Sequence, residues 1–184
     1  MKAKRKRKKT KKISQGAKAN FNGKKQEKAI EKILNLLGFP SFMYSAVKKN
    51  PKLLEGKSRY VLENVPYTNI YESTSYSEFV LFDLENNLII RIESKYQATR
   101  GSVDEKYPFM WDNAVQKQPE PFIFFIFGGG GYRPGAIKHL QNCIDNNEDN
   151  YKERGKDIRL YFMDTFEQWA KETFSQKSSS KNAA

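Results

Sequence analysis

A near-continuous apolar run occupies residues 121–127, with the sequence PFIFFIF. A strand with one face in water alternates apolar and polar residues, whereas an unbroken apolar run is typical of a strand buried on both faces. Such a strand needs a layer of other elements on each side of its sheet. The run therefore predicts a central strand in a layered fold.

Weaker patterns predict the other elements. Ile30, Ile33, Leu34 and Leu37 recur at helical spacing before the stop at Gly38. Prolines and glycines between 39 and 66 predict loops with one or two short elements. The order of elements predicts an α/β sandwich with a mixed sheet: a helix over 23–38, strands near 67–71 and over 77–84 and 88–95, a helix over 103–118, the strand 121–127, a helix over 134–143, a strand over 157–162 and a helix over 164–174.

The chain has 184 residues, 38% of them hydrophobic, which suits one domain with a core of moderate size. Its one cysteine, Cys143, excludes an internal disulfide framework and fits a reducing compartment. No apolar run approaches the roughly 18 residues that cross a bilayer, and no signal-peptide core follows the basic N-terminus. We therefore expect an intracellular protein outside the membrane, cytoplasmic or, in a eukaryotic source, nuclear.

The net charge of +12 is unevenly distributed. Residues 1–25 carry twelve Lys or Arg and no acid, which leaves 21 basic and 21 acidic residues in 26–184. We expect a disordered basic tail over 1–22, one folded domain over 23–174 and a disordered end over 175–184. The tail fits a phosphate-neutralising arm, a nuclear-localisation signal or a solubilising extension. Its candidate nucleic-acid contacts are Lys4, Arg5, Lys6, Arg7, Lys8, Lys9, Lys11 and Lys12.

Two apolar runs, 77–84 and 88–95, flank the polar residues 85–87. This pattern predicts an antiparallel hairpin. With its turn centred between the runs, Glu78 lies directly opposite Glu93. Facing carboxylates repel each other unless a cation lies between them, and Mg²⁺ prefers such oxygen ligands. The pair therefore predicts a divalent metal site.

Side chains alternate along a strand, so Glu93, Lys95 and Gln97 share one face. An ammonium group therefore lies beside the carboxylates. Asp83 is the alternative partner for Glu93, but it lies near the hairpin tip, about 16 Å away at the usual strand rise. That distance is too long for one shared ion, so the geometry favours Glu78.

Three motifs extend this picture. An acid followed by E-x-K on the next strand resembles the core of the PD-(D/E)xK nuclease superfamily, although Ser-Glu here replaces Pro-Asp. The longer strings resemble a branch of small nucleases with E-x-K-x-Q and G-S-x-D-E-K motifs. The resemblance implies a restriction-endonuclease-like sandwich, a central mixed sheet flanked by helices. The matching strings are Ser77-Glu78-Phe79, Ile92-Glu93-Ser94-Lys95-Tyr96-Gln97 and Gly101-Ser102-Val103-Asp104-Glu105-Lys106-Tyr107-Pro108.

The resemblance also implies roles for single residues. Glu78, Glu93 and the backbone carbonyl of Ser94 would hold Mg²⁺ or Mn²⁺. Lys95 would orient the attacking water or stabilise developing negative charge, and Gln97 would help to place that water.

Other features admit two interpretations. Glu27 matches a first-helix glutamate that often reaches the metal in the superfamily, or it is an ordinary exposed glutamate paired with a lysine. Asp104, Glu105 and Lys106 position Lys95 or a phosphate, or this segment is plain helix capping, which needs only Ser102 and Glu105. The tyrosines between 44 and 76 line a nucleic-acid groove or serve packing.

The sequence thus predicts a metal-dependent endonuclease that hydrolyses DNA phosphodiester bonds. The alternatives are a nuclease-like domain that binds nucleic acid through its tail without cutting, an RNA-associated scaffold, and a plain surface ion pair between Glu93 and Lys95. The single histidine, His139, excludes a histidine-based zinc site or catalytic triad. Cutting both strands favours a homodimer, for which the sequence carries no interface signal.

Overall fold

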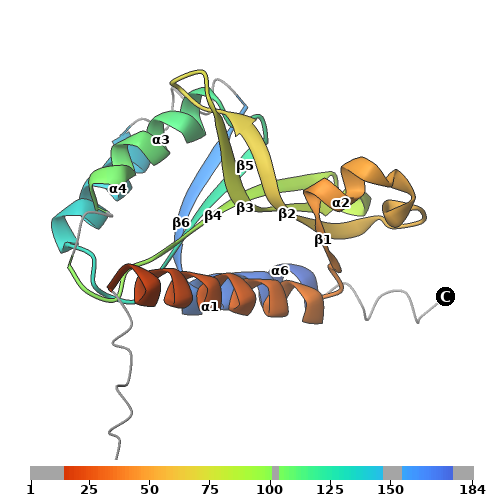
Figure 1. The fold of residues 1–184 in the computed structure, drawn as a ribbon, viewed down its shortest axis with the longest axis horizontal. Helices are drawn as coiled ribbons and strands as arrows, with labels where there is room; N and C mark the ends of the chain where they lie inside the picture. The colour runs from red at the N-terminus through yellow and green to blue at the C-terminus, as the bar shows by residue number, and fades with distance from the viewer. Residues whose placement is uncertain (1–14, 101–103, 147–154, 176–184) are drawn as a thin grey trace, which may run out of the picture.

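A computed structural model describes residues 15–100, 104–146 and 155–175 (Figure 1). One sheet carries six strands in chain order from edge to edge. β1 runs parallel to β2, the pairs β2·β3 and β3·β4 are antiparallel, and β4, β5 and β6 run parallel. The sheet is therefore mixed, as predicted. Its strands are β1 (Ser41–Met43), β2 (Arg59–Thr68), β3 (Thr74–Asp83), β4 (Leu88–Tyr96), β5 (Phe122–Gly128) and β6 (Asp157–Phe162).

Helices cover both faces of this sheet. α1 and α6 pack on one face, while α3 and α4 pack on the other (Figure 1). α2 adds a smaller apolar cluster beside β2 and β3. This arrangement confirms the predicted α/β sandwich. The helices are α1 (Gln15–Leu36), α2 (Tyr44–Lys49), α3 (Tyr107–Gln116), α4 (Pro134–Asn146) and α6 (Met163–Ser175), with single 3₁₀ turns at Pro51–Leu54, Leu84–Asn86 and Asp104–Lys106.

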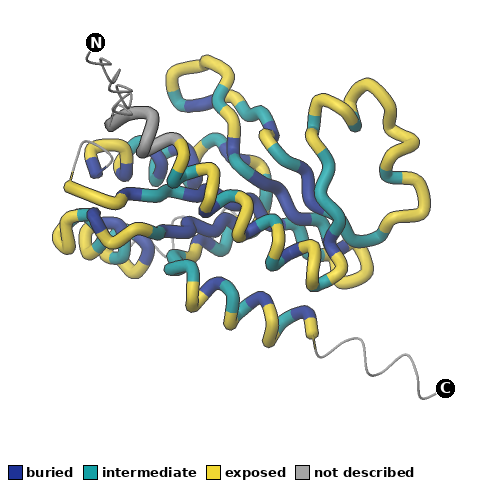
Figure 2. The backbone as a smooth tube through the Cα atoms, turned by 60° about the horizontal axis from the view of Figure 1, so that its bottom comes forward, coloured by how far each residue is buried: buried dark blue, intermediate teal, exposed yellow. Residues whose placement is uncertain are grey.

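The apolar run that predicted a central strand is β5. Phe124 and Ile126 pack under α1 and α6, whereas Ile123, Phe125 and Phe127 pack under α3 and α4. Burial of each such side chain stabilises the fold by roughly 1.5–3 kcal/mol. Both faces of β5 are therefore core, and Figure 2 shows the buried strands between more exposed outer segments.

The hairpin of β3 and β4 has the predicted register. Phe79 pairs with Ile92 and Asp83 pairs with Leu88. The described ladder ends at Phe79, one residue before the level at which Glu78 and Glu93 would pair. On the other side of β3, the paired residues skip Asn64, whose φ of 55° is left-handed. The sheet is thus irregular on both sides of Glu78.

Two boundaries differ from the predictions. α1 begins at Gln15, not Gly23, because the Gln, Ala and Lys residues before Gly23 are good helix formers that tolerate this glycine. Residues 15–22 therefore belong to α1 and not to the tail. β2 begins at Arg59, earlier than the predicted strand near 67–71. Pro66 fits within β2 because it lies beyond the three residues paired with β1.

Later elements differ in smaller ways. A 3₁₀ turn at Asp104–Lys106 precedes α3, so the helix predicted from 103 starts at Tyr107. Ser102 of the predicted capping box lies outside the described residues, as do residues 147–154 of the predicted polar loop. α4 continues to Asn146, three residues past its predicted end.

Candidate active site

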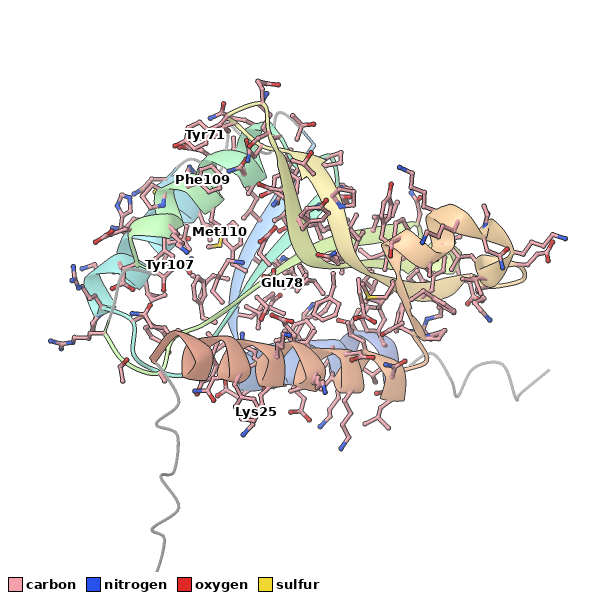
Figure 3. The ribbon with its side chains drawn as sticks, in the orientation of Figure 1. Lys25, Tyr71, Glu78, Tyr107, Phe109 and Met110 are labelled. Atoms are coloured by element: carbon pink, nitrogen blue, oxygen red, sulfur yellow. The ribbon has the colours of Figure 1, made fainter. Side chains whose placement is uncertain are left out.

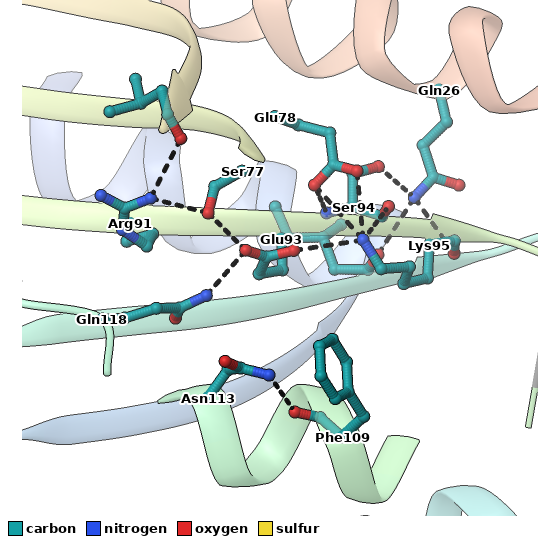
Figure 4. A network of polar contacts seen from close by, with 12 residues as sticks. Gln26, Ser77, Glu78, Arg91, Glu93, Ser94, Lys95, Phe109, Asn113 and Gln118 are labelled. Atoms are coloured by element: carbon teal, nitrogen blue, oxygen red, sulfur yellow. Dashed lines mark hydrogen bonds and ion pairs between the residues drawn. The ribbon is translucent and has the colours of Figure 1, made fainter. Parts of the chain in front are cut away.

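The ammonium group of Lys95 lies at the centre of the candidate site (Figure 4). Its Nζ lies 3.1 and 3.4 Å from the two carboxylate oxygens of Glu78. It also lies 3.2 Å from Oε2 of Glu93 and 3.2 Å from the carbonyl oxygen of Ser94. The structure thus brings the three candidate metal ligands, Glu78, Glu93 and the Ser94 carbonyl, close to Lys95.

Glu78 occupies the place where β3 and β4 stop pairing. Its Oε2 accepts a hydrogen bond of 2.8 Å from the backbone N–H of Ser94. A carbonyl of the neighbouring strand accepts such a bond in a regular ladder. The carboxylate therefore satisfies the N–H that the strand separation frees, and this contact fixes it beside Lys95.

Glu93 is 5% exposed in its side chain and is held by two donors. Gln118 donates to Oε1 at 2.8 Å, and the Ser77 hydroxyl donates to the same oxygen. Arg91 in turn donates to Ser77 at 2.8 Å and forms an ion pair with Glu120. These contacts occupy Oε1 and leave Oε2 facing the Lys95 ammonium.

Burial and the charges of the cluster together shift the pKa values of Glu78 and Lys95. Burial raises the pKa of Glu78; Lys95 opposes this shift, and Glu93 adds to it. Burial works to lower the pKa of Lys95, but the carboxylates of Glu78 and Glu93 outweigh it and the pKa is raised. Lys95 is therefore a cation at neutral pH, and it faces two carboxylates with a single positive charge.

Gln26 of α1 contacts β4 and β5 beside the candidate site and was not singled out from the sequence. Its Nε2 donates to Ser94 Oγ at 2.9 Å, to the Ile126 carbonyl at 3.1 Å and to the Lys95 carbonyl at 3.4 Å. It lies one turn before Ile30, on the apolar face of the helix, so its spacing was a usable signal. Gln118 carried no such signal, and Ser77 was noted only as part of the string Ser77-Glu78-Phe79.

Glu27, the predicted helix acid, is half-buried in a groove of about 600 Å³ between α1 and the sheet. Glu78 lines the same groove, and Figure 3 shows it between α1 and the strands. Burial, followed by the charges of Glu31 and Glu27, raises the pKa of Glu63 there. Glu27 therefore adds negative charge to the groove that Glu78 enters.

Three other predicted residues have partners elsewhere. Gln97 donates to the carbonyl of Gly131 at 3.2 Å, in the loop after β5. Asp104 lies 3.6 Å from Arg133. Asp83 is fully buried at the opposite end of the β3–β4 hairpin, which agrees with the expectation that it is too far from Glu93 to share an ion.

The residues around Lys95 fit a hard divalent cation. Across the described ranges, no group of three or more His, Cys, Asp or Glu side chains is arranged to hold a metal. The set that meets at Lys95 has two carboxylates and one main-chain carbonyl. All are oxygen ligands of the kind that Mg²⁺ and Mn²⁺ accept, and water commonly completes such a shell.

The fold is an α/β domain with a mixed sheet between helices, in which two acids and a lysine converge where two strands separate. The chain belongs to the PD-(D/E)XK nuclease superfamily: residues 18–174 match the family model described as a PD-(D/E)XK nuclease superfamily domain. This membership supports a nuclease-type function and implies a nucleic-acid substrate, and nucleases of this superfamily generally use divalent metals.

The search of curated proteins and the search of solved structures both returned no match. Within the residues that the structure describes, none of the helices has the length and apolar character needed to cross a bilayer.

Proposed function

We propose that this protein is a metal-dependent endonuclease that hydrolyses the phosphodiester bonds of DNA. The observation that carries the proposal is the convergence of Glu78, Glu93 and the Ser94 carbonyl on one cationic group, the ammonium of Lys95. Superfamily membership supports the reaction class.

Glu78, Glu93 and the Ser94 carbonyl would hold Mg²⁺ or Mn²⁺, and Glu27 would complete the shell directly or through water. A divalent ion bound there supplies a Lewis acid that polarises the scissile phosphate and lowers the pKa of the attacking water. Gln118 holds Glu93 so that one carboxylate oxygen points into the site.

Lys95 supplies the second part of the mechanism. Its raised pKa keeps the ammonium charged, so it can orient the attacking water or stabilise negative charge on the phosphate oxygens. Gln97 contacts the Gly131 loop, and its predicted role in placing water stays a prediction.

The basic tail would hold the DNA. Residues 1–14, outside the described part of the chain, include nine Lys or Arg. Deletion of these residues should weaken DNA binding and reduce its salt dependence, because each lost phosphate contact removes about 0.9 from the slope of log K against log salt concentration. Titrations at several salt concentrations measure this slope, and an unchanged slope would show that the tail does not contact phosphate.

The test of the proposed reaction is cleavage of supercoiled, linear and branched DNA in Mg²⁺, in Mn²⁺ and in EDTA. Glu93→Ala and Lys95→Ala should each abolish cleavage, and EDTA should do the same. Cleavage in excess EDTA, or in both variants, would contradict the proposal. Plasmid nicking compared with linearisation then tests whether two copies of the chain act together.

The second candidate is a nuclease-like domain that binds DNA without cutting it. It is favoured by one observation: both oxygens of Glu78 already contact donors, Ser94 N–H and Lys95. Salt-sensitive binding without cleavage under any metal would select this candidate.

A further inference from the structure

A second cavity lies beside the candidate active site, at the carboxyl ends of β4, β5 and β6. Its volume is about 620 Å³, and it is lined by α1, by the ends of these strands and by the first residues after β5 and β6. The crevice at the carboxyl ends of parallel strands is the usual ligand position in open α/β sheets. Its volume falls within the range of about 300–1,000 Å³ for small-ligand sites. The cavity is therefore large enough for one nucleotide.

Aromatic side chains form part of the cavity walls. Tyr96, Tyr132 and Phe162 line it, and all three are half-buried. Tyr132 packs against Phe162 with ring centroids 5.7 Å apart, which fixes both rings. Fixed aromatic rings with accessible surface are the elements on which proteins stack unpaired bases. These walls therefore favour a flat aromatic ligand.

The rim of the cavity carries one basic and one acidic side chain, and the Lys25 ammonium lies 4.6 Å from the centroid of the exposed Phe21 ring. Lys25 of α1 lines the cavity and is exposed to solvent, and Asn22 lies one turn before it. The acid at the rim, Asp164, already accepts a hydrogen bond of 2.9 Å from the backbone N–H of Thr165. The rim thus offers an ammonium group to an anionic ligand.

The cavity lies next to the candidate active site, with Gln26 between them. Tyr96 follows Lys95 directly on β4, and Gln26 lines the cavity while its amide binds Ser94 and the Lys95 carbonyl. A Cβ atom at Gly128 would lie 2.1 Å from Oε1 of Gln26, so a side chain at this position would displace the Gln26 amide. Gln26 therefore lines the cavity and also contacts Ser94 and the Lys95 main chain, beside the candidate metal ligands.

We propose that this cavity binds one unpaired nucleobase of the DNA substrate by stacking against Tyr96, Tyr132 and Phe162, with Lys25 facing a phosphate of that strand. The inference rests on the proposed nuclease function and specifies its substrate form. A base in a paired duplex is not free to enter a cavity of this size, so the preferred substrate carries an unpaired nucleotide next to the cleavage position.

The test measures binding without metal. Two fluorescein-labelled duplexes carry a single-nucleotide bulge, as thymidine in one and as an abasic nucleotide in the other. Fluorescence anisotropy in EDTA gives both affinities. The full chain should bind the thymidine bulge about tenfold more tightly, the order expected for one stacked base. Because backbone charge is the same in both probes, contacts of the basic tail cancel in the ratio.

Tyr132→Leu and Phe162→Leu should reduce this affinity ratio to about one. Phe42→Leu is the matched control, because Phe42 is a half-buried aromatic residue in the separate cluster beside α2, and its ratio should stay at the full-chain value. A ratio near one for the unaltered chain, or an undiminished ratio in both cavity variants, would overturn the inference.

Photocrosslinking keeps the inference testable if a variant does not fold. The unaltered chain is irradiated with a duplex that carries 5-iodouracil in the bulge, and the adduct is mapped by mass spectrometry. Adducts on Tyr96, Tyr132 or Phe162 support the cavity as the base site, whereas adducts confined to other residues, or none, overturn it. These binding results do not depend on cleavage, because no metal is present. Loss of the base preference would overturn the base-binding inference and leave the nuclease proposal intact. Absence of cleavage in Mg²⁺ would remove the nuclease proposal and leave the binding result unchanged.

Discussion

The two ends of the β3–β4 hairpin both hold a buried acid beside a base, yet they differ in charge balance and backbone geometry. At the tip, Asp83 is paired on both sides within the regular ladder, lies 3.7 Å from Arg59 and accepts a 2.6 Å hydrogen bond from Asn86. At the open end, two carboxylates share the single ammonium of Lys95, where the ladder has ended.

This difference separates a structural ion pair from a candidate binding site. One arginine offsets one aspartate at the tip, so no further cation is needed there. Two glutamates exceed one lysine at the open end, and the strand separation frees a carbonyl, that of Ser94, to face the same point. Carboxylates in excess of the local positive charge, together with a free main-chain carbonyl, are ligands that a divalent cation accepts.

The largest expected effect comes from exchanging one acid at each end. Glu78→Gln removes a candidate metal ligand and should lower the DNA cleavage rate more than about 100-fold, beyond the usual loss for residues that only support a ligand. Asp83→Asn should keep the rate within about twofold and lose roughly 1–3 kcal/mol of unfolding free energy. Cleavage kinetics and urea unfolding of both variants measure this contrast, and a greater rate loss in Asp83→Asn would reverse the assignment.

Removal of the base at each end should separate the two sites by their response to metal. Lys95→Met leaves two carboxylates without their ammonium, so it should lower the Tm in EDTA, and Mn²⁺ should then raise the Tm by more than in the unaltered protein. Arg59→Met should also lower the Tm, with no added gain from Mn²⁺. Thermal unfolding with and without Mn²⁺ tests this, and equal metal responses in the two variants would contradict the comparison.

The smallest expected effect is a dependence of stability on pH at the open end. The pKa of Glu78 is raised above its ordinary value of 4.5, so the folded protein holds this proton more tightly than the unfolded chain does. The stabilisation from this proton is complete below pH 4.5 and is lost as the pH rises through the folded pKa.

Glu78→Gln removes this titration. The unfolding free energy of the unaltered protein minus that of the variant should therefore fall as the pH rises above 4.5. Urea unfolding in EDTA between pH 4 and 7 measures the difference. A difference that grows with pH would contradict the raised pKa.

Local patterns predicted much of this molecule because they report on short-range structure. The turn between the two apolar runs set the register of β3 and β4, and the run in β5 predicted its burial on both faces. The predicted start of helix α1 at Gly23 was wrong. The helix begins earlier, at Gln15, because the residues before Gly23 favour a helix but none of them marks its start. Pro66 led to a predicted strand that started too late. Whether a proline fits inside β2 depends on where the pairing with β1 ends, which the sequence does not show.

The support of the candidate site was harder to predict because it joins residues that are far apart in the chain. Gln26 and Ser94 are 68 residues apart, and Glu93 and Gln118 are 25 residues apart. Hairpin register and strand alternation identified the two acids and the lysine. Only the three-dimensional packing shows that the amide of Gln118 holds Glu93. The break in the ladder at Glu78 is likewise a property of three strands together and not of one motif.

The central claim is that Glu78, Glu93 and the carbonyl of Ser94 form one cation site. The most direct test is a crystal structure with Mn²⁺, using the anomalous signal of the metal. We predict a peak bound by these three groups, with the Lys95 ammonium displaced from its contacts with both carboxylates. A map with no peak there, or with a peak beside Asp83 while Lys95 still bridges the two glutamates, would contradict this account.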